Sequence, residues 1–563
     1  MDRTILRAAL HFARRRVPVV CSMFRHPAAD IPAVAEPRRP GSHRRPQLHR
    51  VRGTAAPPAR LTRRPRERTH LAERVPDRWE RAVHRPPSCR PRAIRGGSHD
   101  RIVEETMAVT SENPHYRLGE APGRMPLVGN ALKIFSDPLN YLPALREQGD
   151  VVRVKLGPDT AYMAVTHDVV QEVLHNPRIF DKGGEFIDKM RVILGDGVGT
   201  CSVNTHKRQR AFIQPAFSKH KITGYTEVMA TQAARLVEYW RPGQEIDVLE
   251  EMSRLTTRVT AQAMFSDPDV SAAAIAEVQR SFPVVWKGVF RRMMVPLPVV
   301  HEIPTRANRE YRQALDRLEG VISTMAEAYR RDERERDDIL SILLAGRDED
   351  GHPMTDTEIR DELMTILAAG VETPASGLAW ALYLTSRHPG VEARLHEEVD
   401  AVLGGRTATA EDHPQLPYTN RIVNEALRMY PPVWFITRRA TTDTTLGGHH
   451  VPAGSSILFS PYALHRDPAV FADPDGFDPD RWLPERLREL PRNAVISFSG
   501  GSRKCLGDVL ANHEMTIALA TVSARWRLRE KPGHVLKPVP KAELTIGHMP
   551  MIVEPRDGGG TAA

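Results

Sequence analysis

The residues best suited to chemistry in this chain lie in one short segment near its C-terminus. Phe498, Gly501, Arg503, Cys505 and Gly507 stand at the spacing Phe-x-x-Gly-x-Arg-x-Cys-x-Gly. A glycine turn precedes the cysteine and a helical pattern follows it, so backbone N–H groups and the positive end of a helix converge on the sulfur. We expect these features to hold the Cys505 thiol as a thiolate, the form of cysteine that binds metals.

The chemistry open to a single thiolate is narrow. A zinc or iron–sulfur site takes about four protein ligands, whereas one axial thiolate is enough for haem iron. In that interpretation Arg503 binds a haem propionate, Phe498 forms an aromatic wall, and Gly507 lets the next helix approach the porphyrin. The alternative is a buried cysteine in a glycine-rich turn, which is the ordinary interpretation of an isolated cysteine.

The segment resembles the haem-binding signature of the cytochrome P450 monooxygenases, and every fixed position of that signature is present. The resemblance covers about residues 121–555. It implies a mainly α fold with a small β region, in which haem b lies between a long central helix and the cysteine loop. Two runs, 180–184 and 305–315, are similar to those of bacterial terpene-oxidising members.

A second group of candidate catalytic residues lies inside a long predicted helix. A capping-box pattern opens at Thr355, and the apolar pattern continues to about His388. Glu372 is a charge in an otherwise buried helix, which indicates a partner or a function. Pro374 lacks an N–H and clashes with the carbonyl four residues earlier, so we expect the helix to open at Gly370 and leave room for a ligand or water.

Together with Thr373, these residues resemble the Ala/Gly-Gly-x-Glu/Asp-Thr signature of the same family. The resemblance implies that a groove at Gly370 admits dioxygen and that Glu372 and Thr373 relay protons to it. Pro374, directly after the threonine, departs from the usual pattern. The plain alternative is a proline-kinked core helix that carries a stray glutamate.

Further cationic residues are candidates for binding the haem propionates. His206 and Arg210 are four residues apart and therefore share one face of a predicted helix. A solvated basic face is the alternative, and the resemblance favours propionate contact. It also implies propionate contacts for Arg438, with Arg439 as its alternative, and for His465.

A structural network is implied by two other segments. Glu425 and Arg428 match the Glu-x-x-Arg pattern of the family, and Arg481 lies in Pro-Asp-Arg-Trp, which matches a later segment. The family more often has Glu and Phe at the second and fourth positions of that segment. The resemblance implies that the three residues hold the loop beneath the haem.

The composition argues against a disulfide-rich secreted protein and against a membrane protein. The 563 residues include four cysteines, too few and too scattered for a disulfide framework, which fits a reducing cytoplasm. No stretch approaches the roughly 18 apolar residues of a membrane span. Arginines interrupt the apolar residues near the N-terminus, so we expect neither a membrane anchor nor a secretory signal.

The net charge of +9 comes from the N-terminal segment. Residues 1–106 contain 25 Arg, no Lys, 10 acidic residues and 13 Pro, and we expect them to be disordered. Three interpretations are open: an arm that binds nucleic acid or an anionic surface, an inert tail, or a segment outside the working protein. We prefer the third, in which residues 107–563 form the haem domain. Purification of a chain that starts at Met107 tests this, because loss of haem binding or solubility would overturn it.

The function implied by the resemblance is insertion of one oxygen atom from O2 into a C–H bond of a hydrophobic small molecule. We find no flavin or nicotinamide motif, so electrons are expected from ferredoxin and ferredoxin reductase, with a ferredoxin docking near Lys504 and Arg208. A monomer is expected, and nucleic-acid binding is not. The alternatives are a haem sensor, or a thiolate-haem enzyme that uses peroxide or catalyses dehydration or isomerisation.

Overall fold

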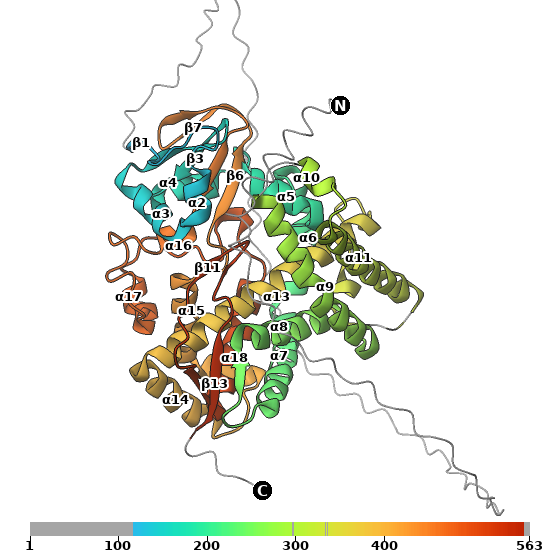
Figure 1. The fold of residues 1–563 in the computed structure, drawn as a ribbon. Coiled ribbons are helices and arrows are strands. Elements are labelled where there is room, and N and C mark those ends of the chain that lie inside the picture. Colours follow the sequence, from blue (N-terminus) through green and yellow to red (C-terminus); the bar gives the residue numbers. More distant parts are fainter. Residues whose placement is uncertain (1–115, 295–297, 333, 335, 557–563) are drawn as a thin grey trace, which may run out of the picture. The chain divides into compact units, whose positions relative to one another are not determined.

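A computed structural model describes residues 116–294, 298–332, 334 and 336–556 of the chain. Helices make up most of this part, and the strands form one six-stranded sheet and three smaller ones (Figure 1). The expected fold class, mainly α with a small β region, is confirmed. The expectations for residues 1–106 lie outside the described residues.

The largest sheet combines strands from both ends of the described chain, coloured blue and orange in Figure 1. Its order is β1 (Leu118–Glu120), β2 (Val151–Leu156), β3 (Asp159–Ala164), β9 (Ser456–Phe459), β6 (Ile436–Ala440) and β4 (Phe180–Asp181). β2 and β3 form an antiparallel hairpin, and its turn uses Gly157 with a φ of +63°. β9 pairs with β3 in parallel and with β6 antiparallel, which joins segments far apart in the sequence.

Three smaller sheets complete the β structure. They consist of β10 (Trp526–Glu530), β13 (Pro550–Pro555) and β5 (Glu245–Asp247), of β11 (Val539–Pro540) with β12 (Leu544–Thr545), and of β7 (Thr444–Leu446) with β8 (His449–Val451). All their pairings are antiparallel. The hairpin of β11 and β12 contacts the central helix described next, because the Leu544 carbonyl accepts a hydrogen bond from Ser376 Oγ at 2.9 Å.

The central element is helix α13 (Asp356–Arg387). It begins at a complete capping box, in which Thr355 Oγ1 accepts from the Glu358 N–H at 3.2 Å and the Glu358 carboxylate accepts from the Thr355 N–H at 2.8 Å. The predicted start and end of this helix are confirmed. Most of its side chains are buried, as the predicted apolar run requires.

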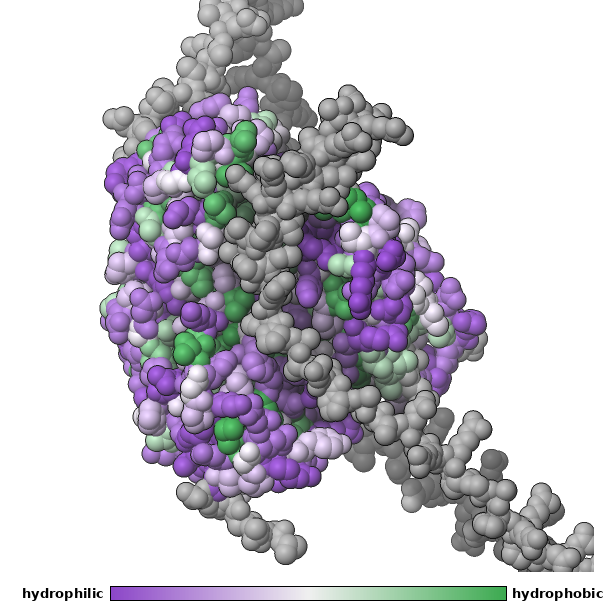
Figure 2. Space-filling view, viewed as in Figure 1, coloured by the Kyte–Doolittle hydropathy of each residue, from purple (hydrophilic) through white to green (hydrophobic). Residues whose placement is uncertain are grey.

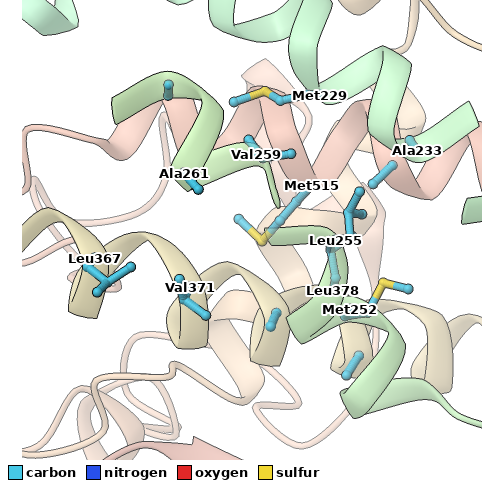
Figure 3. Close-up of a cluster of buried hydrophobic side chains, with 14 of the residues drawn as sticks. Met229, Ala233, Met252, Leu255, Val259, Ala261, Leu367, Val371, Leu378 and Met515 are labelled. Carbon is cyan, nitrogen blue, oxygen red and sulfur yellow. The ribbon is translucent and has the colours of Figure 1, made fainter. Parts of the chain in front are cut away.

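Three of the helices that pack against α13 make the most extensive contacts with it. They are α8 (Val248–Met264), α15 (Pro417–Met429) and α18 (Asp508–Arg525), and α7 (Lys219–Tyr239) in turn covers α8 and α18. Figure 3 shows side chains of α8, α13 and α18 gathered in one apolar cluster, with Leu255, Leu378 and Met515 among them. Each fully buried side chain of this size contributes about 1.5 to 3 kcal/mol, so the cluster holds α18 against α13.

Pro374 does not open α13. The helix is continuous through the proline, so the prediction of an opened turn is wrong. The Gly370 carbonyl, which receives no N–H from Pro374, accepts a hydrogen bond from the Thr260 hydroxyl of α8 at 2.8 Å. A Cβ at Gly370 would lie 2.8 Å from that hydroxyl oxygen, so the glycine permits close contact between helices and leaves no groove on that side.

The other helices surround this core. The longer ones are α5 (Glu185–Leu194), α6 (Val203–Ile213), α9 (Pro268–Met294), α11 (Arg306–Arg331), α12 (Ile339–Ala345) and α14 (Pro389–Leu403), and the shorter ones are α2 (Ala131–Ser136), α3 (Pro138–Ala144), α4 (His167–His175), α10 (Pro298–Glu302), α16 (Pro461–Leu464) and α17 (Pro484–Leu487). Hydrophilic residues cover most of the visible face in Figure 2. Within the described ranges, no helix is both long and apolar enough to cross a membrane.

Replacing Thr260 by Val should lower the free energy of unfolding by about 1 to 3 kcal/mol, because the Gly370 carbonyl would lose its partner inside a packed interface. Urea unfolding followed by circular dichroism measures the change. Thr257→Val is the control, since Thr257 is also buried but donates to the Ser253 carbonyl of its own helix at 2.7 Å. Equal losses in the two variants would contradict a specific role for the bond to Gly370.

Candidate active site

The cysteine loop is held in shape by its backbone. The Cys505 N–H donates to the Phe498 carbonyl at 3.0 Å, which closes the loop ahead of α18. Gly501 opens the 3-10 helix η5 (Gly501–Arg503) with a φ of +64°, and a Cβ there would lie 2.2 Å from the carbonyl oxygen of Leu174. Any other residue at this position would push the loop away from α4.

At Gly507, unlike at Gly501, contacts within the protein do not require a glycine. A Cβ at this position would lie 3.6 Å from the Phe217 ring and 4.0 Å from Cys505 Sγ, which are ordinary contact distances. Protein packing therefore does not require the glycine. Its lack of a side chain keeps the surface beside the sulfur flat, as a planar group bound to the sulfur would need.

The protonation of Cys505 differs from the prediction. The side chain is exposed, yet burial of the sulfur among protein atoms raises the pKa of the thiol, against the lowering effect of the Gly507 N–H and of the ammonium groups of Lys182 and Lys504. The expectation that the loop alone holds a thiolate is wrong. Coordination to a metal ion removes the proton from a thiol, so iron itself would complete the ligand.

Two buried arginines lie beside the cysteine loop. Arg503 is 8% exposed and donates to Asp181 Oδ1 at 2.9 Å and to Cys201 Sγ at 3.7 Å. Arg438 of β6 is 3% exposed and donates to the neighbouring Thr437 carbonyl at 2.9 Å. None of the described carboxylates forms an ion pair with Arg438, although a buried charge is costly without one.

His206 and Lys182 join these arginines in a basic cluster, defined as Lys182, His206, Arg438 and Arg503. Burial lowers the pKa of His206, and with the added effect of Arg503 and Arg210 the value falls to about 4. Burial likewise lowers the pKa of Lys182 to about 7 and that of Arg438 to about 10, with neighbouring guanidinium groups adding to both effects. Neighbouring positive charges repel one another, and an anion bound among them stabilises them. The two propionates of a haem are suitable anions.

Lys182 carries no signal in the local sequence pattern, and no prediction included it. It follows Asp181, whose carboxylate accepts from the Val203 N–H at 2.8 Å as well as from Arg503. These contacts fix β4 against the start of α6 and the cysteine loop. Only this long-range pairing places the lysine in the basic cluster.

Arg210 and Arg439 have other partners in the structure. Arg210 Nη1 donates to the carbonyls of Ser502 and Lys504 at 3.2 and 3.1 Å, so it braces the cysteine loop from α6. Arg439 is partly exposed and pairs with Asp188 at 2.6 Å. Arg438, the first choice of the two neighbouring arginines, is therefore the one that belongs to the basic cluster.

The predicted propionate contact of His465 is corrected. The ring is fully buried, with Nδ1 3.0 Å from the Arg428 carbonyl oxygen and Nε2 accepting from the Ile496 N–H at 2.9 Å. Both ring nitrogens are thus bound to backbone. Burial accordingly lowers the pKa of His465 to about 3, and the residue links α15 to the segment that leads into the cysteine loop.

The structural network is present and fully buried. Glu425 accepts from Arg428 at 2.8 and 2.9 Å and from Arg481 Nε at 3.2 Å, and Arg428 also donates to the carbonyl of His465 at 2.9 Å. Trp482 Nε1 donates to Glu425 Oε2 at 3.0 Å. The tryptophan, which departs from the usual phenylalanine, therefore adds a hydrogen bond to the network.

Glu372 and Thr373 lie together on α13. The Thr373 hydroxyl donates to the Ala369 carbonyl, and Ala369 is exposed although most of the helix is buried. Burial raises the pKa of the Glu372 carboxyl, with Lys541 acting in the opposite direction. A carboxyl group that holds its proton more firmly than an ordinary glutamate thus adjoins a hydroxyl on the accessible side of the helix.

Comparison with known proteins identifies the family. The cytochrome P450 sequence model matches residues 120–553, which include the cysteine loop, α13 and the Glu425 network. The chain therefore belongs to the cytochrome P450 family, and its enzyme class is that of the P450 monooxygenases.

Three similar proteins come from Streptomyces. Cyclooctatin synthase of Streptomyces melanosporofaciens is 46% identical over 79% of this chain and 98% of its own length. Cyclooctat-9-en-7-ol 5-monooxygenase of the same organism is 43% identical over 80% and 98% of the two chains. Pentalenene oxygenase of Streptomyces avermitilis is 41% identical over 76% and 95%.

Glu425→Gln should lower the free energy of unfolding by about 3 to 5 kcal/mol, because two buried guanidinium groups would lose their carboxylate. Urea unfolding measures the loss. Glu250→Gln is the control: its partner Arg254 is exposed, and this change should cost less than about 1 kcal/mol. A loss for Glu425→Gln no larger than the control's would contradict the structural role of the network.

Proposed function

We propose that this protein is a haem-thiolate monooxygenase that hydroxylates a terpene in bacterial secondary metabolism. The observation that carries the proposal is the adjacent carboxyl and hydroxyl of Glu372 and Thr373 on α13, in a chain of the cytochrome P450 family. The substrate class rests on the names of the similar proteins, two of which refer to cyclooctatin chemistry and one to pentalenene. Terpenes are apolar, and they suit the hydrophobic substrate expected of a P450.

In this proposal haem b supplies the iron at which dioxygen is bound and split. Cys505 would bind this iron through its sulfur, and Gly507 would leave room for the planar group beside the sulfur. Arg438, Arg503 and His206, together with the additional Lys182, would bind the propionates, and the charges of the two guanidinium groups favour the anionic form. Phe498 packs against the apolar core beside the loop.

The residues of α13 move the protons. Splitting dioxygen releases one oxygen atom as water, which consumes two protons and two electrons. Thr373 passes a proton from its hydroxyl oxygen toward the reacting oxygen and regains one from the Glu372 carboxyl. The raised pKa of Glu372 suits this task, because an acid that keeps its proton can donate it.

An external electron donor is required, and we propose ferredoxin with ferredoxin reductase. The expected docking cations need revision, however. Arg208 is paired with Asp348 at 2.9 Å and with Glu358, and Lys504 is paired with Asp508 at 2.5 Å. Neither cation is free to bind an acidic partner without breaking an internal pair, so the site near Lys504 and Arg208 has little support.

We also propose that the haem domain spans residues 107–563 as a monomer in the cytoplasm. The family match at 120–553 falls inside this range. A reducing compartment suits Cys201 and Cys505, which are both free thiols. The haem sensor and the peroxide-using or dehydrating enzyme are the competing functions, and neither needs protons delivered at Thr373.

Thr373→Ala should lower the amount of product formed per dioxygen consumed by about tenfold or more, with peroxide released instead, because the proton donor at the reacting oxygen is lost. Oxygen uptake, peroxide and product are measured with cyclooctat-9-en-7-ol and pentalenene as substrates. Thr385→Ala is the control, since Thr385 is buried on the same helix about three turns away.

Unchanged coupling in Thr373→Ala would contradict the oxygen-activating function and favour the competing functions. The spectrum of the haem-loaded protein tests the substrate class separately. If neither terpene changes the spin state of the iron or yields a product, the terpene assignment fails.

A further inference from the structure

The hairpin of β11 and β12 brings a second carboxyl group to α13. The hairpin is held against the helix by the Leu544 carbonyl, which accepts from Ser376 Oγ at 2.9 Å and from Trp380 Nε1 at 3.4 Å. The Leu544 N–H donates to the Pro432 carbonyl at 2.9 Å, which fixes the hairpin from the other side. Glu543 directly precedes Leu544 and is therefore positioned by these bonds.

Glu543 and Glu372 are neighbours across this contact. Ser376 lies one turn after Glu372, so both residues are on the same face of α13 and both face the hairpin. Glu543 is 4% exposed, and its Oε2 is buried without a hydrogen-bond partner among the described residues. Among the described residues, Lys541, which is exposed in the turn of the hairpin, is the cation that acts on the Glu372 carboxyl.

The two acids hold protons differently. Burial raises the pKa of Glu543 well above that of an ordinary glutamate, and the charge of Glu372 raises it further. Burial also raises the pKa of Glu372, but Lys541 opposes this effect. Two close carboxyls of this kind do not ionise together at neutral pH, so the pair keeps at least one proton.

The fold does not need the Glu543 carboxyl. The hairpin is attached through the backbone of Leu544 and through the Lys541 carbonyl, which accepts from Trp434 Nε1 at 3.0 Å. The described hydrogen bonds include none to the Glu543 side chain, and the desolvation of an unpartnered carboxyl group destabilises the fold. A buried acid that weakens the fold and adjoins a proposed proton donor calls for a functional explanation.

We propose that Glu543 is a positioning residue that supplies the proton Glu372 delivers to Thr373. The O–H bond on Glu543 breaks as one forms on the Glu372 carboxylate, and Glu372 in turn reprotonates the Thr373 oxygen. Glu543 then regains a proton from solvent on the Lys541 side, so each passage moves one proton inward and leaves the pair unchanged, and two passages supply the two protons consumed for each dioxygen. This inference rests on the proposed function of Glu372 and Thr373.

Infrared titration of the resting protein tests whether the pair is coupled. Glu372→Gln should shift the midpoint of the Glu543 carboxylic-acid band to lower pH, because the like charge that raises the Glu543 pKa is removed. Glu543→Gln identifies the band by its loss. Glu362→Gln is the matched control, since Glu362 is a fully buried acid of α13 whose pKa is raised to about 8 by burial, and its substitution should not move the Glu543 band. An unshifted midpoint in Glu372→Gln would overturn the pairing.

Turnover tests the direction of proton flow. Glu543→Gln should slow product formation about tenfold and increase the solvent deuterium isotope effect, while haem content and terpene-induced spin change stay as in the wild type. Glu543→Asp should recover part of the rate, because it restores an ionisable group. Wild-type rates and isotope effects in Glu543→Gln would overturn the proposal.

The two proposals fail in different ways. If Thr373→Ala uncouples oxygen use and Glu543→Gln behaves as wild type, the role of Glu543 is wrong and the proposed function stands. If Thr373→Ala has no effect, the proposed function itself fails, and so does proton supply through Glu543. The infrared shift in Glu372→Gln would then show only that the two acids share a site.

Discussion

The structure depends on a buried carboxylate that compensates two buried guanidinium groups. Glu425 accepts hydrogen bonds from Arg428 of its own helix and from Arg481 and Trp482 of the segment Pro479–Trp482. Removal of the carboxylate or of a guanidinium group would leave the opposite charge buried without a partner, which is energetically costly. The network therefore stabilises one arrangement of these segments. His465 extends it by linking the Arg428 backbone to Ile496, just ahead of the loop.

The balance of buried charges also differs between the cysteine loop and the Glu372 region of α13. On the cysteine side, the buried cations of the basic cluster outnumber the one acid, Asp181, that pairs with them, which suits a dianionic cofactor. On the α13 side the relation is reversed, because among the described residues the two acids Glu372 and Glu543 adjoin each other and Lys541 opposes the pKa shift of Glu372 alone. Both arrangements fit the proposed haem chemistry, which needs a dianionic cofactor and consumes protons.

Much of this was predictable from local sequence. The cysteine loop, the capping box of α13, the Glu425 network and the mixed fold class each depend on residues close in the chain or on a recognisable motif. The errors and omissions concern groups whose surroundings come from distant segments. Thr260 satisfies the Gly370 carbonyl across two helices, Lys182 reaches the cluster through strand pairing, and burial changes the pKa of Cys505; no local periodicity reveals any of these.

The central claim is that Cys505 binds haem iron as a thiolate although the protein alone favours the thiol. The reduced carbon-monoxide difference spectrum tests it most directly, because thiolate ligation gives a characteristic red-shifted Soret band. The account predicts this band in the wild type and in Cys201→Ser, and its loss in Cys505→Ser with haem still bound. A band that persists in Cys505→Ser, or is absent from the haem-loaded wild type, would contradict the account.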